Sequence, residues 1–315
     1  MAQQSKNGTS VASLLLLGYS RILAPEQSDH AMNIRAYAKI NLGLHVLGKR
    51  PDGYHNIETV FRLIDLYDEL EILQNDEGIH FSSNTAQLSN DNTNLCIRAA
   101  NLLRDLTGIH MGVEISLTKG IPMGAGLGGG SSDAAAILKG LTKLWALDIS
   151  REELQTISAT LGSDVPFFFS GQTAYATGRG EILQPFDLKI PYIILVATPT
   201  IHVSTPWAYS RATPQANTKR LNLRSLLEHS IADSATLRAE LTNDFEETVY
   251  QEFPEILRLK ETLLAGGAAC ALMSGSGSSV FGFFLSSAEA TELAKKLSTS
   301  YFTSVTEPIF KPEID

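Results

Sequence analysis

The residues of this chain best suited to chemistry lie in a glycine-rich stretch, residues 122–132. Five of the seven residues at 124–130 are glycine. Apolar residues then recur at helical spacing over residues 134–145, so the loop opens onto a helix N-terminus. There, free backbone N–H groups and the positive end of the helix dipole favour a phosphate, and glycine lets the backbone close around it. We predict that the phosphates of a nucleotide would be bound by Pro122, Met123, Gly124, Ala125, Gly126, Leu127, Gly128, Gly129, Gly130, Ser131 and Ser132.

The two serines that end this loop have two interpretations. Ser131 and Ser132 could donate to a phosphate or hold Mg2+ through water, and they could also cap the helix. Asp133 is favourable near a helix N-terminus in any case, and we assign it no metal. No metal-ligating residue is predicted in this chain.

Two common nucleotide motifs fit the loop poorly. Gly124-x-Gly126-x-x-Gly129 matches the dinucleotide fingerprint as a bare pattern, but it lies mid-chain and two helical stretches follow it. The P-loop pattern fails because no lysine follows the last glycine. A phosphate-binding loop of another type is favoured over a simple turn.

A lysine and an aspartate outside this loop are candidates for catalysis. Residues 34–46 alternate between apolar and polar types, which predicts a half-buried strand with Lys39 on its polar face. Asp164 lies in a Gly/Ser/Pro loop, where a carboxylate could accept the proton of an attacking hydroxyl. Taken alone, Lys39 is more simply a solvated strand lysine, because exposed lysines are common, and Asp164 could be an ordinary helix-end or turn aspartate.

The remaining pattern predicts an α+β protein, because strands and helices mix without a βαβ rhythm. We expect a turn at 49–53 and a capping box of Ser150 and Glu153. Other strands are expected at 56–65, 70–73, 113–117, 174–177, 193–197, 269–273 and 280–284, and helices at 94–106, 150–160, 288–297 and over most of 213–265.

Two domains are predicted, residues 32–190 and 191–315. Residues 1–31 contain a short apolar run that is a poor signal peptide, so we interpret them as a leader that is disordered or precedes the true start.

Composition limits the partners of the chain. Of its 315 residues 43% are hydrophobic, enough for a sizeable core, and the net charge of −9 argues against nucleic acid as a partner. No apolar run is long enough to span a membrane. The two cysteines, Cys96 and Cys270, form no CxxC pair, which favours free thiols in the cytoplasm.

Three segments resemble the motifs of one kinase superfamily. The glycine loop, residues 36–42 and residues 273–277 are similar, in the right order, to the three motifs of the GHMP kinases. Residues 38–55, ending in Asp52-Gly-Tyr-His55, resemble the kinases that act on 4-diphosphocytidyl-2-C-methyl-D-erythritol (CDP-methylerythritol) in the non-mevalonate isoprenoid pathway. The resemblance covers about residues 32–310 and implies an N-terminal domain like ribosomal protein S5 domain 2 and a ferredoxin-like C-terminal domain.

The resemblance also implies an activity. ATP, carrying Mg2+, would lie in the glycine loop and give its γ-phosphoryl group to the C2 hydroxyl of CDP-methylerythritol. Asp164 would be the general base and Lys39 its catalytic partner. The implied cytoplasmic enzyme is a monomer or homodimer. Its substrate-binding residues would be Asn41, Tyr54, His55, Thr205, Tyr209, Gly275 and Gly277, with Tyr54 and Tyr209 sandwiching the cytosine.

Three alternatives stay open at this point. The chain could be another small-molecule GHMP kinase of the homoserine or mevalonate type, against which Asp52–His55 argues. It could be a catalytically silent nucleotide sensor of the same fold, against which Lys39 and Asp164 argue. The least favoured alternative is a dinucleotide oxidoreductase.

Overall fold

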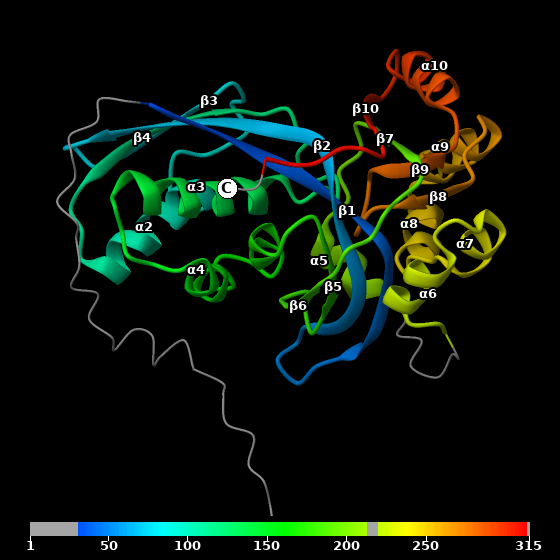
Figure 1. Cartoon of the computed structure of the whole chain (residues 1–315), viewed down its shortest axis with the longest axis horizontal. Coiled ribbons are helices and arrows are strands. Elements are labelled where there is room, and N and C mark those ends of the chain that lie inside the picture. The colour runs from blue at the N-terminus through cyan, green and yellow to red at the C-terminus, as the bar shows by residue number, and fades with distance from the viewer. Residues whose placement is uncertain (1–30, 213–219, 314–315) are drawn as a thin grey trace, which may run out of the picture.

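A computed structural model describes residues 31–212 and 220–313 and gives an α+β protein built on two sheets (Figure 1). The predicted fold class is therefore confirmed. The leader predicted over residues 1–31 lies, except for its last residue, outside the described residues.

The first sheet has six strands, and two of them are unusually long. β2 pairs antiparallel with β1 along almost its whole length, with β5 near its start and with β4 near its end. β3 and β6 pair with β4 and β5 and form the outer edges. The strands are β1 (Met32–Lys49), β2 (His55–Asn75), β3 (Ile79–Ser83), β4 (Gly112–Thr118), β5 (Thr173–Thr177) and β6 (Ile182–Pro185).

The long strands correct two sequence predictions. Residues 56–65 and 70–73 belong to one strand, β2, because β1 gives it a continuous partner. β1 is not half-buried, since every residue from Ala36 to Val46 is buried. Three register shifts interrupt the pairing of β1 with β2 and change which hydrophobic core each face of β1 contacts. Its polar side chains therefore lie inside the molecule rather than in solvent.

Helices cover one face of this sheet. α3 (Gly129–Leu144) packs on β1 and β2, beside α2 (Leu95–Thr107), α4 (Arg151–Ser158) and the short η1 (Val165–Phe169) (Figure 1). Each predicted start is present: Asn94 caps α2, and Ser150 and Glu153 form the capping box of α4. The buried face of α3 therefore fixes the position of its N-terminus, where the glycine loop ends.

The second sheet has the strand order β10-β7-β9-β8, with all neighbours antiparallel. Its strands are β7 (Ile193–Thr198), β8 (Cys270–Met273), β9 (Val280–Phe284) and β10 (Phe302–Thr306). Helices join β7 to β8 and β9 to β10, which is the ferredoxin-like arrangement that the resemblance implied. These helices are α5 (Thr205–Arg211), α6 (Leu223–Ser230), α7 (Ser234–Glu240), α8 (Glu246–Glu252), α9 (Pro254–Ala265) and α10 (Ser287–Leu297). Residues 213–219 of the predicted helical stretch lie outside the described residues.

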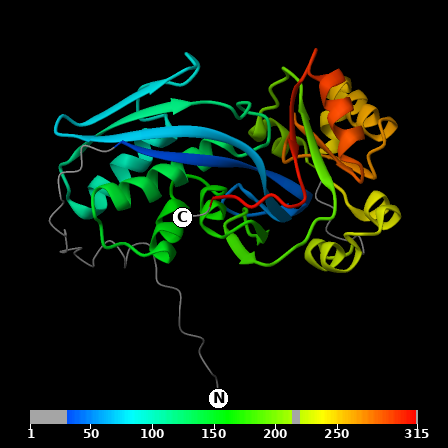
Figure 2. The same ribbon diagram turned by 45° about the horizontal axis from the view of Figure 1, so that its top comes forward.

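Several contacts join the two halves. Leu44 of β1 forms a short parallel backbone pairing with residues 242–244, in which Leu44 N–H donates to Thr242 O at 2.9 Å. The C-terminal segment returns to the first sheet, where the Glu313 N–H donates to the Tyr37 hydroxyl (Figure 2). The chain changes sheets between β6 and β7, and the domain boundary near residue 190 stays a proposal. No helix in the described ranges has the length and hydropathy to cross a membrane.

Candidate active site

The glycine loop has the conformation of an anion cradle. Gly126 and Gly128 have φ of +79° and +72°, which side chains disfavour, and Gly128 is the N-cap of α3. Gly128 offers no side chain to the first N–H groups of the helix, and Ser132 N–H makes the first helical bond, to Gly128 O. The N–H groups of the first turn are thus left for a ligand, at the positive end of the helix dipole.

The loop is fixed by the other two motif segments. Lys39 N–H of β1 donates to Leu127 O at 2.9 Å, and the Ser274 hydroxyl donates to Gly126 O at 2.9 Å. A Cβ at Gly126 would overlap the carbonyl oxygen of Ser274, so only glycine permits this approach. Segments more than 80 residues apart in sequence therefore meet at one point.

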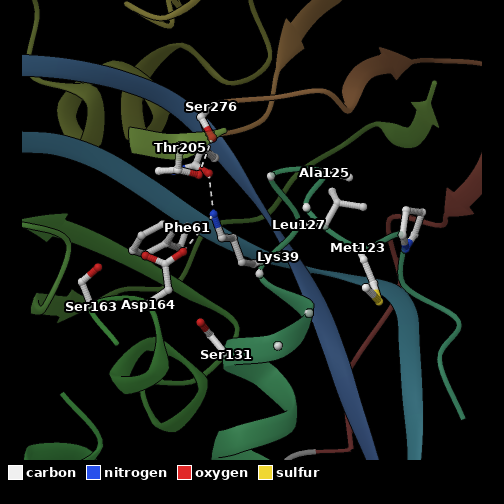
Figure 3. Close-up of a pocket in the computed structure, with 18 of the residues that line it drawn as sticks. Lys39, Phe61, Met123, Ala125, Leu127, Ser131, Ser163, Asp164, Thr205 and Ser276 are labelled. Atoms are coloured by element: carbon white, nitrogen blue, oxygen red, sulfur yellow. Dashed lines mark hydrogen bonds and ion pairs between the residues drawn. The ribbon is translucent and has the colours of Figure 1, made fainter. Parts of the chain in front are cut away.

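A cavity of about 430 Å3 opens beside the loop and contains Lys39 and Asp164 (Figure 3). Lys39 Nζ lies 3.4 Å from Asp164 Oδ2; the lysine side chain is 4% exposed and the aspartate 33%. The cation is thus enclosed, and the carboxylate remains open to a ligand. Gly128 leaves room for the lysine, because a Cβ there would come within 3.0 Å of Lys39 Cε.

Further contacts fix the direction of the lysine. Lys39 Nζ donates to Asn41 Oδ1 at 2.7 Å and lies 4.9 Å from the centre of the Phe61 ring. Asn41 Nδ2 donates in turn to the Thr59 hydroxyl at 2.9 Å, and that hydroxyl donates to Gly43 O. Because each polar group has a partner, the ammonium is held in one orientation toward Asp164.

A second group of charges lies under the start of α3. Lys119 Nζ pairs with Asp68 and also with Asp133, the latter at 2.9 Å. Burial, opposed by Lys119 and reinforced by Asp68, raises the pKa of Asp133 to about 8. Lys119 also lines the cavity, so this buried group gives it a fixed position at the nucleotide end.

An adjoining cavity of about 420 Å3 is lined by aromatic side chains. His55 and Tyr209 are stacked, with ring centres 5.3 Å apart, and Tyr54 is 57% exposed at the rim. Burial, with the charge of Lys49, lowers the pKa of His55, so the ring is neutral at pH 7 with one donor and one acceptor nitrogen. Burial, reinforced by Asp164, raises the pKa of Tyr209, which stays protonated.

The structure brings most of the residues predicted from the sequence into these two cavities. The first is lined by Lys39, Asn41, residues 122–131, Asp164, Thr205, Tyr209 and Gly275, and the second by Tyr54, His55, Thr205 and Tyr209. Tyr209 stacks on His55 and the Tyr54 ring lies under Arg179, and the sandwich of a cytosine between Tyr54 and Tyr209 stays a prediction.

Two predicted residues lie outside the cavity lining. The Ser132 hydroxyl donates to Tyr37 O at 2.7 Å and fixes α3 to β1, so it has no proton left for a phosphate. Neither serine caps α3, because the N-cap is Gly128. Gly277 N–H closes a turn onto Ser274 O and supports the loop from behind.

Sequence analysis missed several charged or aromatic residues that line the two cavities: Lys49, Phe61, Lys119, Arg179 and Phe245. Lys119 lies three residues before the glycine loop, Phe61 lies on β2 across from Asn41, and Arg179 occupies a turn between two glycines. Only the glycines around Arg179 gave a usable signal, since a polar residue in a tight turn at a strand end often lies near a site.

No three or more His, Cys, Asp or Glu side chains cluster in a way that could hold a metal, over residues 31–212 and 220–313. A Mg2+ ion in this cavity would therefore depend on the phosphates and water for most of its ligands. The partly exposed Ser131 lies in the cavity wall at the start of α3, and its hydroxyl could assist.

The close approach at Gly126 leads to a prediction. Gly126→Ala is expected to destabilise the fold by roughly 1–3 kcal/mol and to raise the KM for ATP, because the added Cβ must push the loop from Ser274. Gly108→Ala is the matched control, since its φ is +70° and nothing lies near its Cβ position. Thermal unfolding and ATP kinetics measure both; equal effects on the KM would contradict the prediction.

The comparisons with known proteins agree with this geometry. Residues 94–172 match the family model for the GHMP kinases N terminal domain, and residues 223–303 match that for the GHMP kinases C terminal. Solved structures also share the fold, among them two kinases. A crystal structure of 4-(cytidine 5'-diphospho)-2C-methyl-D-erythritol kinase has a TM-score of 0.76 and 36% identity, over 87% of this chain and 98% of its own. A homoserine kinase from Cytophaga hutchinsonii has a TM-score of 0.71 at 17% identity, over 91% and 97%, which shows the fold alone.

The fold and the two family models that match it define a GHMP kinase, a small-molecule phosphotransferase. The chain is 44% identical to the 4-diphosphocytidyl-2-C-methyl-D-erythritol kinase of Chlorobium phaeobacteroides (strain BS1), over 89% of this chain and 98% of the relative. It is 43% identical to that of Prosthecochloris aestuarii (strain DSM 271 / SK 413), over the same shares. The chain belongs to the 4-diphosphocytidyl-2-C-methyl-D-erythritol kinase family.

Proposed function

We propose that this protein transfers the γ-phosphoryl group of ATP to the C2 hydroxyl of CDP-methylerythritol. The observation that carries the proposal is the Lys39–Asp164 pair, 3.4 Å apart, between the phosphate cradle and the aromatic cavity. ATP phosphates at the start of α3 and a cytidine among Tyr54, His55 and Tyr209 would bring donor and acceptor together at this pair.

The reaction needs positioning and neutralisation of charge more than covalent chemistry. The C2 oxygen forms a bond to the γ-phosphorus while the bond from that phosphorus to the β–γ bridging oxygen breaks, and ADP leaves. Asp164 accepts the hydroxyl proton or orients the hydroxyl. Lys39 stabilises the charge that develops on the transferring group. Mg2+ bound to ATP would neutralise part of the charge on the phosphate oxygens.

The other interpretations are less well supported. A dinucleotide oxidoreductase of the doubly wound class would need a parallel sheet, whereas β4, which leads into the loop, is antiparallel to β2. A silent sensor would not need the enclosed Lys39 beside an accessible Asp164. Against a homoserine or mevalonate kinase, the aromatic cavity suits a nucleoside base.

The oligomeric state and the cellular location are part of the same proposal. The protein is proposed to be a monomer or a homodimer. A cytoplasmic location is proposed because ATP is the donor and Cys96 and Cys270 are buried free thiols.

The direct test incubates the purified protein with Mg-ATP and CDP-methylerythritol and follows ADP release and product mass. We expect one ADP for each phosphorylated product. Turnover of homoserine or mevalonate in place of CDP-methylerythritol would refute the assignment, and binding of ATP with no turnover of any acceptor would support the silent sensor.

The exposed Tyr54 gives a prediction for the cytidine end. Tyr54→Ala is expected to raise the KM for CDP-methylerythritol about 5- to 150-fold, the value of one base–aromatic stack, with a much smaller change in kcat. Tyr54→Phe should restore the KM. Leu47→Ala is the control, because Leu47 is also exposed on this hairpin and lines neither cavity. An unchanged KM for Tyr54→Ala would remove this residue from the site.

A further inference from the structure

The two cavities meet at a junction with one strongly basic side chain. Four residues line both cavities: Ser163, Arg179, Thr205 and Tyr209. Arg179 is the only lysine or arginine among them in the part of the chain that the structure describes. A group that spans both cavities therefore lies close to Arg179.

Backbone contacts of the turn that carries Arg179 hold this residue next to the site. The residue lies in the turn between β5 and β6, flanked by Gly178 and Gly180, both with positive φ. Ile57 N–H of β2 donates to Gly178 O at 2.7 Å, and a Cβ at Gly180 would lie 3.7 Å from Asp164 Oδ1. The turn is thus attached to the strand that begins at the aromatic cavity and also adjoins the catalytic carboxylate.

The Arg179 side chain is placed against the predicted base-stacking residue. Its guanidinium carbon lies 4.9 Å from the centre of the Tyr54 ring, a cation–π contact. Its Nε lies 3.6 Å from Glu181 Oε1, a weak ion pair between side chains that are 31% and 23% exposed. The contact with Tyr54 orients the planar group, and the long ion pair leaves most of its N–H donors for a ligand.

The proposed substrate carries its own charge between its two ends. In CDP-methylerythritol a diphosphate joins the cytidine to the methylerythritol. With the cytidine in the aromatic cavity and the C2 hydroxyl at Asp164, the diphosphate must cross the junction. A planar guanidinium recognises such oxygens through paired N–H···O bonds.

We propose that Arg179 is a specificity-determining residue that binds the diphosphate of the substrate and holds Tyr54 as one wall of the cytidine site. The proposal rests on the proposed function, because that function places a diphosphate at the junction. Binding of the diphosphate by Arg179 would let the enzyme distinguish CDP-methylerythritol from small alcohols such as homoserine, which have no diphosphate to contact the guanidinium.

Steady-state kinetics test the proposal. Arg179→Gln is expected to raise the KM for CDP-methylerythritol about 10- to 100-fold, the loss of one charge-assisted interaction, and to leave the KM for ATP unchanged. Added salt should raise the KM of the unmodified protein more than that of the variant. Arg50→Gln is the matched control, because Arg50 pairs with Asp52 at 3.0 Å on the neighbouring turn and lines neither cavity.

A binding measurement that needs no turnover completes the test. By calorimetry, CDP should bind the unmodified protein about tenfold or more tighter than cytidine, and Arg179→Gln should remove most of that difference. Arg179→Lys should keep part of this difference in affinity, because lysine supplies a positive charge but lacks the planar, paired N–H donors of arginine. Equal loss of CDP and cytidine binding would overturn diphosphate recognition, as would an unchanged KM in a variant that melts normally. Failure of the unmodified protein to phosphorylate CDP-methylerythritol would instead refute the proposed function.

Discussion

Asp164→Asn is expected to lower kcat by about 10²- to 10⁴-fold and to leave ATP binding nearly unchanged. The carboxylate lies beside the enclosed Lys39 ammonium and is the accessible member of the pair. An amide keeps the shape and one acceptor oxygen, but it cannot take up a proton at neutral pH. ADP release under saturating substrates measures kcat, and nucleotide titration measures ATP binding.

Two further variants sharpen this experiment. Asp105→Asn on α2 controls for loss of an acidic residue, because Asp105 is exposed and lines neither cavity. Asp164→Ala separates the two roles of the carboxylate. If the residue mainly orients the hydroxyl, as a loose transition state permits, the amide should retain far more activity than alanine. A near-normal kcat in both variants would reject a catalytic Asp164.

The glycine loop was the feature most readily predicted from sequence, because its effect is local. Glycine density and the helical period that follows it predict a phosphate cradle without knowledge of the rest of the chain. The order of the three motif segments, residues 36–42, the glycine loop and residues 273–277, then led to the superfamily, and with it to the ferredoxin-like second domain and the pairing of Lys39 with Asp164.

Other features depend on long-range contacts that periodicity does not report. β1 alternates like a surface strand, yet the register shifts and the second domain bury both faces, so Lys39 is an enclosed cation. The Ser132 hydroxyl was predicted from sequence to bind phosphate, but in the fold it donates to the Tyr37 carbonyl of β1. β10, an edge strand of mixed polarity, was missed because it is defined by its pairing with β7.

The contacts among the side chains of the aromatic cavity also could not be predicted from sequence alone. Tyr54, His55 and Tyr209 were each assigned to cytidine, but the choice of partners required the fold. The β5–β6 turn places Arg179 over Tyr54, although the two residues are more than 120 positions apart in the chain. Spacing in sequence could not predict that contact.

Lys39→Met is the second substitution with a large expected effect. Methionine fills the space of the lysine stem beside Phe61 and removes the charge, so the fold should survive. The ammonium donates to Asn41 and faces Asp164, and its loss leaves both without this partner and the transferring group without a fixed cation. By analogy with loss of a preorganised donor, kcat should fall about 10²- to 10³-fold, measured as ADP release.

The pair also predicts how the two losses combine. Because Lys39 and Asp164 act on one reacting group at 3.4 Å, the double variant Lys39→Met, Asp164→Asn should be little slower than the slower single variant. Lys189→Met, at an exposed position outside both cavities, controls for removal of a lysine charge. Fully multiplicative losses would mean that the two residues act independently, and the assignment of a single catalytic pair would then be wrong.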